Sequence, residues 1–179
     1  NANQLKGIIE PPFPLVTLVV EYDSDNERLM KKATKRAAKI FEKYATSLQT
    51  ATEPEQQQKL WKVRQSSSVI LAHNGGLVRG VPVINDAAVP PDRLREYLEG
   101  VEKLFQAANL PAAIWGHAGD GNLHIQPTLN LGQVGDRQKA FRLLDEYFKL
   151  VHGLGGTLSA ESGDGRYLIA AIAVGLVGF

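Results

Sequence analysis

Residues 112–129, AAIWGHAGDGNLHIQPTL, contain two predicted strands joined by a Gly-rich turn. The strands are expected at Ala112–Gly116 and Asn122–Leu129, where apolar residues cluster on either side of the turn. Three glycines lie within the six residues 116–121, which indicates a tight backbone with positive φ angles. This stretch therefore predicts a hairpin-like pair of strands.

Amphipathic helices are predicted on either side of this pair. Pro90-Pro91-Asp92 begins the first helix, because proline is favoured in the first helical turn. Its expected apolar face consists of Leu94, Tyr97, Leu98, Val101, Leu104 and Phe105. The second helix is expected over Asp136–Leu154 and stops at Gly155-Gly156. Its expected inward residues are Phe141, Leu144, Phe148 and Val151.

The N-terminal part of the chain predicts a strand followed by two helices. Phe13–Tyr22, FPLVTLVVEY, is apolar and rich in β-branched residues, so we expect a buried strand there. A helix is expected over about Asn26–Leu48, capped by Asp23 or Ser24. After a polar link, a second helix is expected from Glu55 onward.

Shorter segments complete the predicted fold. Ser66–Gly80 is rich in Ser and Gly and predicts a loop. Val81–Val83 and Thr157–Ala160 are short strand candidates. With the helical insert excluded, the order of elements predicts an α+β fold, a ferredoxin-like antiparallel sheet with helices packed on one face. A length of 179 residues favours a single domain over residues 1–179.

The composition is that of an ordinary globular protein. Hydrophobic residues make up 44% of the chain, charged residues 22%, and the net charge is +1. The Lys and Arg residues do not gather in one stripe, which disfavours nucleic-acid binding. The absence of cysteine excludes disulfides, thiolate metal sites and cysteine nucleophiles. Tyr167–Phe179 is almost entirely apolar but shorter than the roughly 20 residues that span a bilayer, so a buried helix or strand is expected.

Two histidines, His117 and His124, flank the Gly-rich turn, which can bring both imidazoles to one point. Neutral imidazole is the commonest protein ligand for zinc and related ions, and two such ligands need a third, usually a carboxylate. Asp120 lies on the turn and can point elsewhere, whereas Glu161 lies in a second Gly-rich turn that follows a predicted strand. The spacing indicates a His-His-Glu metal site, the alternative being histidines that only hydrogen-bond the turn.

The remaining histidines and the common catalytic motifs give no second site. His73 and His152 are interpreted as structural or solvent-exposed, His152 because positive charge suits a helix C-terminus. No phosphate loop and no G-x-G-x-x-G after a strand is present, and no G-x-S-x-G of a serine hydrolase.

The segment from His117 to His124, HAGDGNLH, followed later by GGTLSAE over residues 155–161, resembles the C-terminal domain of FAD-linked oxidases. This is the group of D-lactate, glycolate and D-2-hydroxyglutarate dehydrogenases in the vanillyl-alcohol oxidase superfamily. Leu60-Trp61-Lys62-Val63-Arg64, the segment 85–90 and the segment 15–22 fit the same pattern, so the resemblance covers about residues 10–166.

The resemblance implies a two-domain enzyme, in which an N-terminal domain binds FAD and this domain caps the flavin to form the substrate pocket. It implies a divalent metal, Zn, Mn or Fe, held by the catalytic residues His117, His124 and Glu161. A 2-hydroxy acid would chelate the metal, lose its hydroxyl proton to a base and pass a hydride to the flavin, giving the 2-oxo acid.

The resemblance also implies how substrate and partners bind. Arg64 would bind the substrate carboxylate through its planar fork of donors. Asn122 and Gln126 would line the substrate pocket, with Asn122 also beside the flavin. An electron acceptor (a quinone, a cytochrome or an electron-transfer flavoprotein) is implied, and a homodimer is compatible with the family. We expect a cytoplasmic protein that can associate peripherally with the inner membrane.

The sequence departs from the family pattern at three places. One is the apolar segment Tyr167–Phe179, since after Arg166 the family normally continues with a charged or Pro-containing segment. Ser162 stands where many members have a histidine that is a candidate general base, and a hydroxyl has too high a pKa for that role. Another group, such as metal-bound hydroxide, would take the proton, or the enzyme belongs to a variant subgroup, or its activity is impaired. Arg79, Val83 and Ile84 stand near the place where some members carry a Lys or Tyr.

Two other classes of function stay open at this point. One is a metal-dependent lyase or hydrolase that uses the same cluster without flavin, and the other is a non-catalytic ferredoxin-like interaction module. The chain begins Asn1-Ala2-Asn3-Gln4 without an initiator Met, so we expect an excised piece. It contains no sequence that resembles an FAD-binding domain, and we expect it to be inactive alone.

Overall fold

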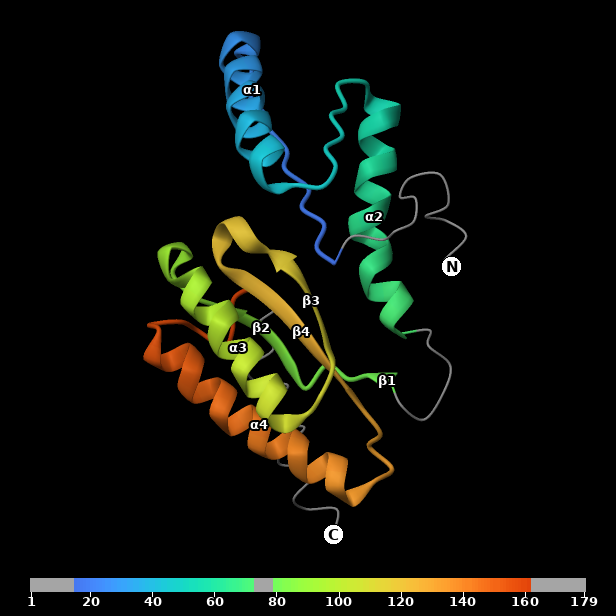
Figure 1. Ribbon diagram of the computed structural model, residues 1–179, viewed down its shortest axis with the longest axis vertical. Helices are drawn as coiled ribbons and strands as arrows, with labels where there is room; N and C mark the ends of the chain where they lie inside the picture. The colour runs from blue at the N-terminus through green and yellow to red at the C-terminus, as the bar shows by residue number, and fades with distance from the viewer. Residues whose placement is uncertain (1–14, 73–78, 162–179) are drawn as a thin grey trace. The chain divides into compact units, whose positions relative to one another are not determined.

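A computed structural model describes residues 15–72 and 79–161 of the chain (Figure 1). The chain forms two compact units, Asn1–Ile70 and Leu71–Phe179. None of the helices in these ranges combines the length and apolar character needed to cross a membrane. His73, Ser162 and the apolar segment Tyr167–Phe179 lie outside the described residues. A single domain over residues 1–179 stays a prediction.

The first unit contains helix α1 (Glu27–Tyr44) and the start of helix α2 (Pro54–Ala72). Asn26 is the N-cap of α1, because its side-chain oxygen accepts hydrogen bonds from the backbone N–H groups of Arg28 and Leu29, both at 3.1 Å. The predicted cap at Asp23 or Ser24 is therefore wrong; Ser24 instead accepts a hydrogen bond from the backbone N–H of Asn26. The predicted end at Leu48 lies beyond the last helical residue.

Two further predictions for this part of the chain are wrong. Residues 15–22 form no strand, and their apolar side chains are exposed, Leu15 fully so. β-branched residues favour a strand only where a neighbouring strand supplies hydrogen bonds and packing, and residues 15–22 have no such neighbour within the described ranges. The predicted loop from Ser66 is instead helical up to Ala72, since serine costs only about 0.5 kcal/mol relative to alanine inside a helix.

The second unit contains an antiparallel sheet centred on β4 (Asn122–Leu129). Strand β3 (Ala112–His117) pairs with β4 along one edge, so the predicted pair of strands is confirmed. The short strand β1 (Arg79–Gly80) and the strand β2 (Ile84–Ala88) also pair with β4.

Two short strand predictions need correction. Val81–Val83 is a turn, where the N–H of Val83 bonds the carbonyl of Val81, and β2 begins only at Ile84. The predicted strand at Thr157–Ala160 is reduced to a single bridge between Thr157 and Ala88.

Helices α3 (Leu94–Ala108) and α4 (Val134–Gly153) lie side by side on one face of this sheet (Figure 1). The short 3-10 turn η2 (Pro91–Arg93) leads into α3, as the proline pair predicts. The buried helical residues are Tyr97, Val101 and Phe105 of α3, and Ala140, Leu143, Leu144, Tyr147 and Val151 of α4. The α+β prediction, a sheet with helices packed on it, is confirmed. Phe141 is not inward as predicted, because 49% of its surface is exposed.

The alternation of side chains along β4 separates the two faces of the sheet. Leu123 and Ile125 are buried within the core that includes the helices. Asn122, His124 and Gln126 point by the same alternation to the opposite face, which we call the open face. The sequence-predicted site residues of this strand therefore lie on the side of the sheet away from α3 and α4.

Candidate functional site

The turn between β3 and β4 is built on two glycines in backbone conformations that residues with a side chain rarely adopt. Gly116 has φ +148° and Gly121 has φ +69°, whereas Gly119 has no positive φ. A Cβ atom at Gly121 would overlap the carbonyl oxygen of Val89, and one at Gly116 would overlap that of Asn122. The turn contains a 3-10 segment, η3 (Ala118–Asp120). This tight connection keeps His117 at the end of one strand within reach of His124 in the next.

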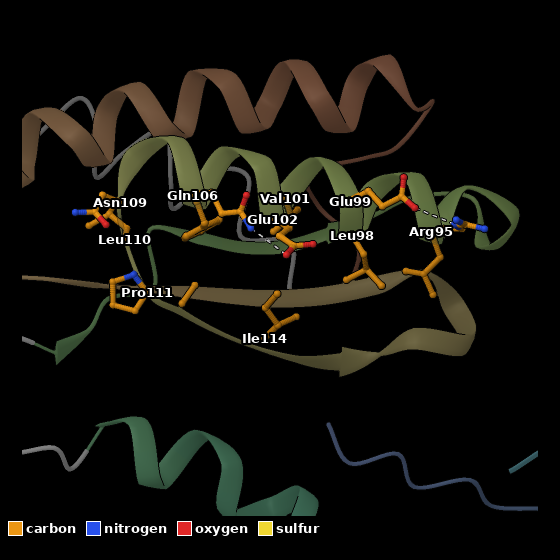
Figure 2. A pocket seen from close by; sticks show the side chains of 13 residues that line it. Arg95, Leu98, Glu99, Val101, Glu102, Gln106, Asn109, Leu110, Pro111 and Ile114 are labelled. Carbon is orange, nitrogen blue, oxygen red and sulfur yellow. Dashed lines mark hydrogen bonds and ion pairs between the residues drawn. The ribbon is translucent and has the colours of Figure 1, made fainter. Parts of the chain in front are cut away.

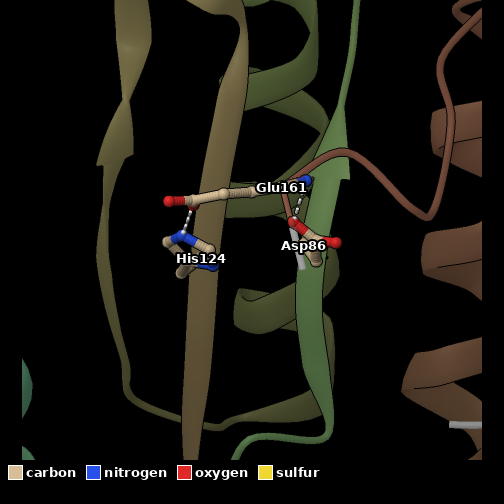
Figure 3. A group of neighbouring side chains, drawn as sticks. All are labelled: Asp86, His124 and Glu161. Atoms are coloured by element: carbon tan, nitrogen blue, oxygen red, sulfur yellow. Dashed lines mark hydrogen bonds and ion pairs between the residues drawn. The ribbon is translucent and has the colours of Figure 1, made fainter. Parts of the chain in front are cut away.

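The two predicted histidines converge on the predicted glutamate. His124 Nε2 lies 3.0 Å from Glu161 Oε2, and His117 Nε2 lies 3.6 Å from Glu161 Oε1 (Figure 3 shows His124 and Glu161). His124 is buried, while the side chains of His117 and Glu161 are about half exposed. The three side chains that the sequence selected as ligands therefore lie together, although their role as ligands stays a prediction.

Trp115 supports the His124 ring from the neighbouring strand. The two residues are directly opposed in the β3–β4 register, so their side chains share the open face. Their ring centroids are 5.9 Å apart with the planes tilted by 35°. This contact restricts the rotation of the imidazole and helps to keep Nε2 directed at Glu161.

Asp86 joins this cluster, which sequence reasoning missed. Possible ligand atoms of Asp86, His124 and Glu161 all lie within 4.8 Å of one another. Asp86 is fully buried on β2, and its side chain accepts a hydrogen bond from the backbone N–H of Glu161 (Figure 3). The signal was available in the sequence, because a lone carboxylate inside the apolar run VPVINDAAV, residues 81–89, is seldom buried without a partner.

Asn122 lies beside the cluster with an unsatisfied acceptor. Its side-chain nitrogen donates to the carbonyl of Ala87 at 3.2 Å, but its buried Oδ1 has no hydrogen-bond partner among the described residues. A buried acceptor left without a donor costs about 1–3 kcal/mol, so a donor group on a bound molecule would be stabilised there. Gln126, half-buried, follows on the same face of β4.

Two other candidate residues, Asp120 and Arg64, are not members of this group of possible ligands. Asp120, the alternative carboxylate, is exposed on η3 and is not part of the group. Arg64, half-buried, lies on α2 in the first unit, and its role toward a substrate carboxylate stays a prediction.

The donor set fits a divalent cation chemically. Two imidazole nitrogens and a carboxylate are typical ligands of zinc and of iron or manganese, with further positions left for water or a substrate. His124 Nε2 and Glu161 Oε2 lie 3.0 Å apart, and His117, His124 and Glu161 would hold the cation, which would act there as a Lewis acid.

A groove lies elsewhere in the same unit. An apolar groove of about 890 Å³ runs between α3 and β3, where Leu98, Val101 and Ile114 contribute to its wall (Figure 2). Ile114 opposes Ile125 in the β3–β4 register and so belongs to the helix-covered face. The groove and the histidine cluster therefore lie on opposite faces of the sheet.

Comparisons with known proteins identify the family of the chain. The family model for the C-terminal domain of FAD linked oxidases matches residues 6–171. Glycolate oxidase subunit GlcD of Bacillus subtilis is 26% identical over 156 residues, which cover 87% of this chain and 32% of that protein. D-lactate dehydrogenase of Archaeoglobus fulgidus is 33% identical over 137 residues, 76% of this chain and 29% of that protein. D-2-hydroxyglutarate dehydrogenase of Haemophilus influenzae is 25% identical over 154 residues, which cover 82% of this chain and 15% of that protein. The chain therefore spans a third or less of the length of each of these three relatives.

Proposed function

Since the chain belongs to the family of FAD linked oxidase C-terminal domains, we propose that it is the substrate- and metal-binding cap domain of an FAD-dependent 2-hydroxy-acid dehydrogenase. The relatives are named for glycolate, D-lactate and D-2-hydroxyglutarate, which are all 2-hydroxy acids. The substrate class of this protein is therefore a small 2-hydroxy acid, oxidised to the 2-oxo acid. The FAD is bound mainly by another domain of the same polypeptide.

The observation that carries the proposal is the convergence of His117 and His124 on Glu161. Both imidazoles approach the same carboxylate through Nε2, at 3.6 and 3.0 Å. Two histidines placed only to support a turn have no need to share one acidic partner from a distant segment. These three residues would hold a divalent metal, Zn, Mn or Fe, on the open face of the sheet.

Asn122, Gln126 and Arg64 would bind and orient the substrate. The buried Oδ1 of Asn122 accepts a hydrogen bond from a donor on the substrate or on the flavin. Gln126 lines the same face, and Arg64 pairs with the substrate carboxylate through two parallel N–H donors. When bound, the metal supplies Lewis acidity that lowers the pKa of the substrate hydroxyl, and FAD supplies the electron acceptor.

The proposal extends to the partners of the whole protein. The reduced flavin would pass its electrons to a quinone, a cytochrome or an electron-transfer flavoprotein. We propose that the protein is cytoplasmic and associates peripherally with the inner membrane. A homodimer would be compatible with a flavin domain bound at the open face.

Metal binding by the 179-residue chain tests the site. We expect calorimetric titration of the metal-free chain with Zn²⁺ or Mn²⁺ to show one site, which His124→Ala or Glu161→Gln abolishes. His152→Ala is the matched control, because it removes an exposed imidazole at the end of α4 without touching the cluster. Equal binding by all four proteins would contradict the proposed site.

Activity of the full-length flavoprotein tests the chemistry. With FAD bound, we expect it to reduce an artificial electron-accepting dye with D-lactate, glycolate or D-2-hydroxyglutarate. Reduction of the dye by none of the 2-hydroxy acids would contradict the proposal. A metal-binding protein without any flavin would favour a lyase or hydrolase instead, and a chain whose partner binding survives loss of both histidines would favour an interaction module.

A further inference from the structure

We propose that Asp86 is a positioning residue, whose buried carboxylate holds the backbone of Glu161 so that the Glu161 side chain is directed at His124. The consequence for a metal rests on the proposed function, because Glu161 matters as a ligand only if the cluster holds a cation. The geometry itself is independent of that function. It comes from β2, from the segment that carries Glu161 and from the contacts between them.

An irregularity in β2 turns Asp86 toward the cluster. The register with β4 shifts between Ile84, which opposes Ile125, and Ala87, which opposes Leu123, so β2 has one residue more than its partner there. Asp86 lies within this bulge with φ +64°, a conformation that Asp and Asn adopt more readily than other non-glycine residues. The bulge lets Ile84 and Ala87 both face the core while Asp86 reaches the group on the open face.

Both carboxylate oxygens of Asp86 are used by the segment that carries Glu161. Oδ1 accepts the backbone N–H of Glu161 at 2.6 Å (Figure 3). Oδ2 accepts the backbone N–H of Ala160 at 3.1 Å. The main-chain oxygen of Asp86 also lies 3.1 Å from the Ala160 nitrogen. Further back, Ala88 and Thr157 exchange two backbone hydrogen bonds, at 2.9 and 2.8 Å. The segment is therefore hydrogen-bonded to β2 at two places, at Thr157 and at Ala160 and Glu161. The contact at Glu161 itself is made by the Asp86 carboxylate.

The chemistry of the contact requires a carboxylate rather than an amide. A buried carboxylate is stable when N–H donors compensate its charge, and bonds from N–H to an ionised acceptor are stronger than neutral ones. An asparagine has only one acceptor oxygen, so its amide nitrogen would face one of the two backbone N–H groups. Asp86→Asn keeps the size and the tolerance of positive φ, but its side chain cannot accept hydrogen bonds from both N–H groups.

The position of the Glu161 side chain depends on contacts at both its backbone N–H and its carboxylate. Its side chain is about half exposed, so little packing restricts its rotamers. Its backbone N–H is held by Asp86 and its carboxylate by His124, and the two contacts fix the direction of the side chain between them. Release of the backbone end would let the carboxylate leave His124.

Nuclear magnetic resonance of the metal-free 179-residue chain tests the positioning directly. In the wild type we expect slow hydrogen exchange at the amides of Ala160 and Glu161, and fast exchange there would overturn the proposal without any variant. Asp86→Asn should move the ¹⁵N resonance of His124 Nε2 in the same direction as Glu161→Gln does. The matched control, Asp120→Asn, removes an exposed carboxylate from the neighbouring turn and should leave that resonance in place. A His124 resonance that responds to Glu161→Gln but not to Asp86→Asn would overturn the proposal.

Zn²⁺ affinity provides the second readout. Asp86→Asn should weaken Zn²⁺ binding about 10- to 100-fold, the range typical for groups that orient metal ligands. In a chain that already carries Glu161→Gln, the same substitution should cause no further loss, because Asp86 acts through Glu161. An equal further loss would show that Asp86 acts on the cation itself and would overturn the positioning role. If the wild-type chain binds no Zn²⁺, the proposed function fails, and the resonance and exchange measurements still decide the role of Asp86.

Discussion

Single residues decide whether the turn between the two histidines can form. Gly116 and Gly121 have positive φ values, and a side chain at either would overlap backbone oxygen. Gly119, between them, has neither constraint, since nothing lies within 4 Å of a Cβ placed there. The sequence shows three similar glycines, but only two of them are required by the backbone.

We predict that Gly121→Ala destabilises the protein by about 1–3 kcal/mol or more, because a strained φ and a collision with the carbonyl of Val89 combine. Gly119→Ala, the matched control, should change the free energy of unfolding by less than about 1 kcal/mol in either direction. Urea unfolding followed by circular dichroism measures both. Similar values for the two variants would show that the turn does not need the left-handed conformation at Gly121.

At the scale of elements, two tyrosine hydroxyls join α3 to α4. Tyr97 and Tyr147 are both almost fully buried, and their hydroxyl groups hydrogen-bond each other inside the core. Their rings are also in contact, with centroids 6.1 Å apart. The helices therefore share a polar contact in an otherwise apolar interface, and each hydroxyl depends on the other for its hydrogen bond.

We predict that Tyr97→Phe and Tyr147→Phe each lower the free energy of unfolding by about 1–3 kcal/mol, because each leaves the other hydroxyl buried without its partner. The double substitution should cost less than the sum of the two, since it removes both polar groups. Chemical denaturation of the four proteins in a double-mutant cycle measures this coupling. Strict additivity would mean that the two hydroxyls do not interact in solution.

The same pair predicts a loss of stability in alkali. Burial raises the pKa of Tyr97 to about 12 and raises that of Tyr147 as well, where the neighbouring Tyr97 adds to the effect. A group whose pKa is higher in the folded protein than in the unfolded chain contributes to the free energy of unfolding. This contribution is fully present below the unfolded pKa, here 10, and is lost as the pH rises through the folded pKa. For Tyr97 alone the loss corresponds to about 3 kcal/mol between pH 10 and about 12.

Denaturation at a series of alkaline pH values checks this prediction. The free energy of unfolding of the wild type should fall above pH 10, and the double variant Tyr97→Phe/Tyr147→Phe should show a shallower fall. A rise in the free energy of unfolding of the wild type over this pH range would contradict the prediction.

At the scale of the whole molecule, the proposed function makes the chain a capping domain that would not catalyse the reaction by itself. Its second unit places the histidine cluster on the open face of the sheet, and α3 and α4 cover the other face. A flavin domain that approached the open face would meet the cluster and Asn122, where a buried acceptor lacks a donor among the described residues.

We predict that a bound cation stabilises the chain. A metal that binds only the folded state adds RT ln(1 + [L]/Kd), about 2.7 kcal/mol at a free concentration of 100 times Kd. Differential scanning calorimetry should show a higher unfolding temperature with Zn²⁺ that a chelator reverses. The increase should persist in His152→Ala and be absent in Glu161→Gln. An increase of the same size in Glu161→Gln would place the cation elsewhere.

The sequence by itself determined the hairpin of β3 and β4 and the amphipathic helices α3 and α4. It also selected His117, His124 and Glu161, whose role as ligands stays a prediction. These follow from local rules, namely glycine spacing, helical periodicity and the family motif, which nearby residues satisfy among themselves. Residues 15–22 show where local rules fail, because their strand propensity has no paired neighbour in the described structure.

Only the tertiary structure decided how the site is held together. Asp86 and Glu161 are far apart in sequence, and a bulge in β2 together with the return of the chain after α4 brings carboxylate and backbone N–H into contact. The pairing of Tyr97 with Tyr147 is also non-local. Such contacts depend on strand register and helix packing, which are set by the burial of many residues at once. A local sequence pattern therefore does not predict them.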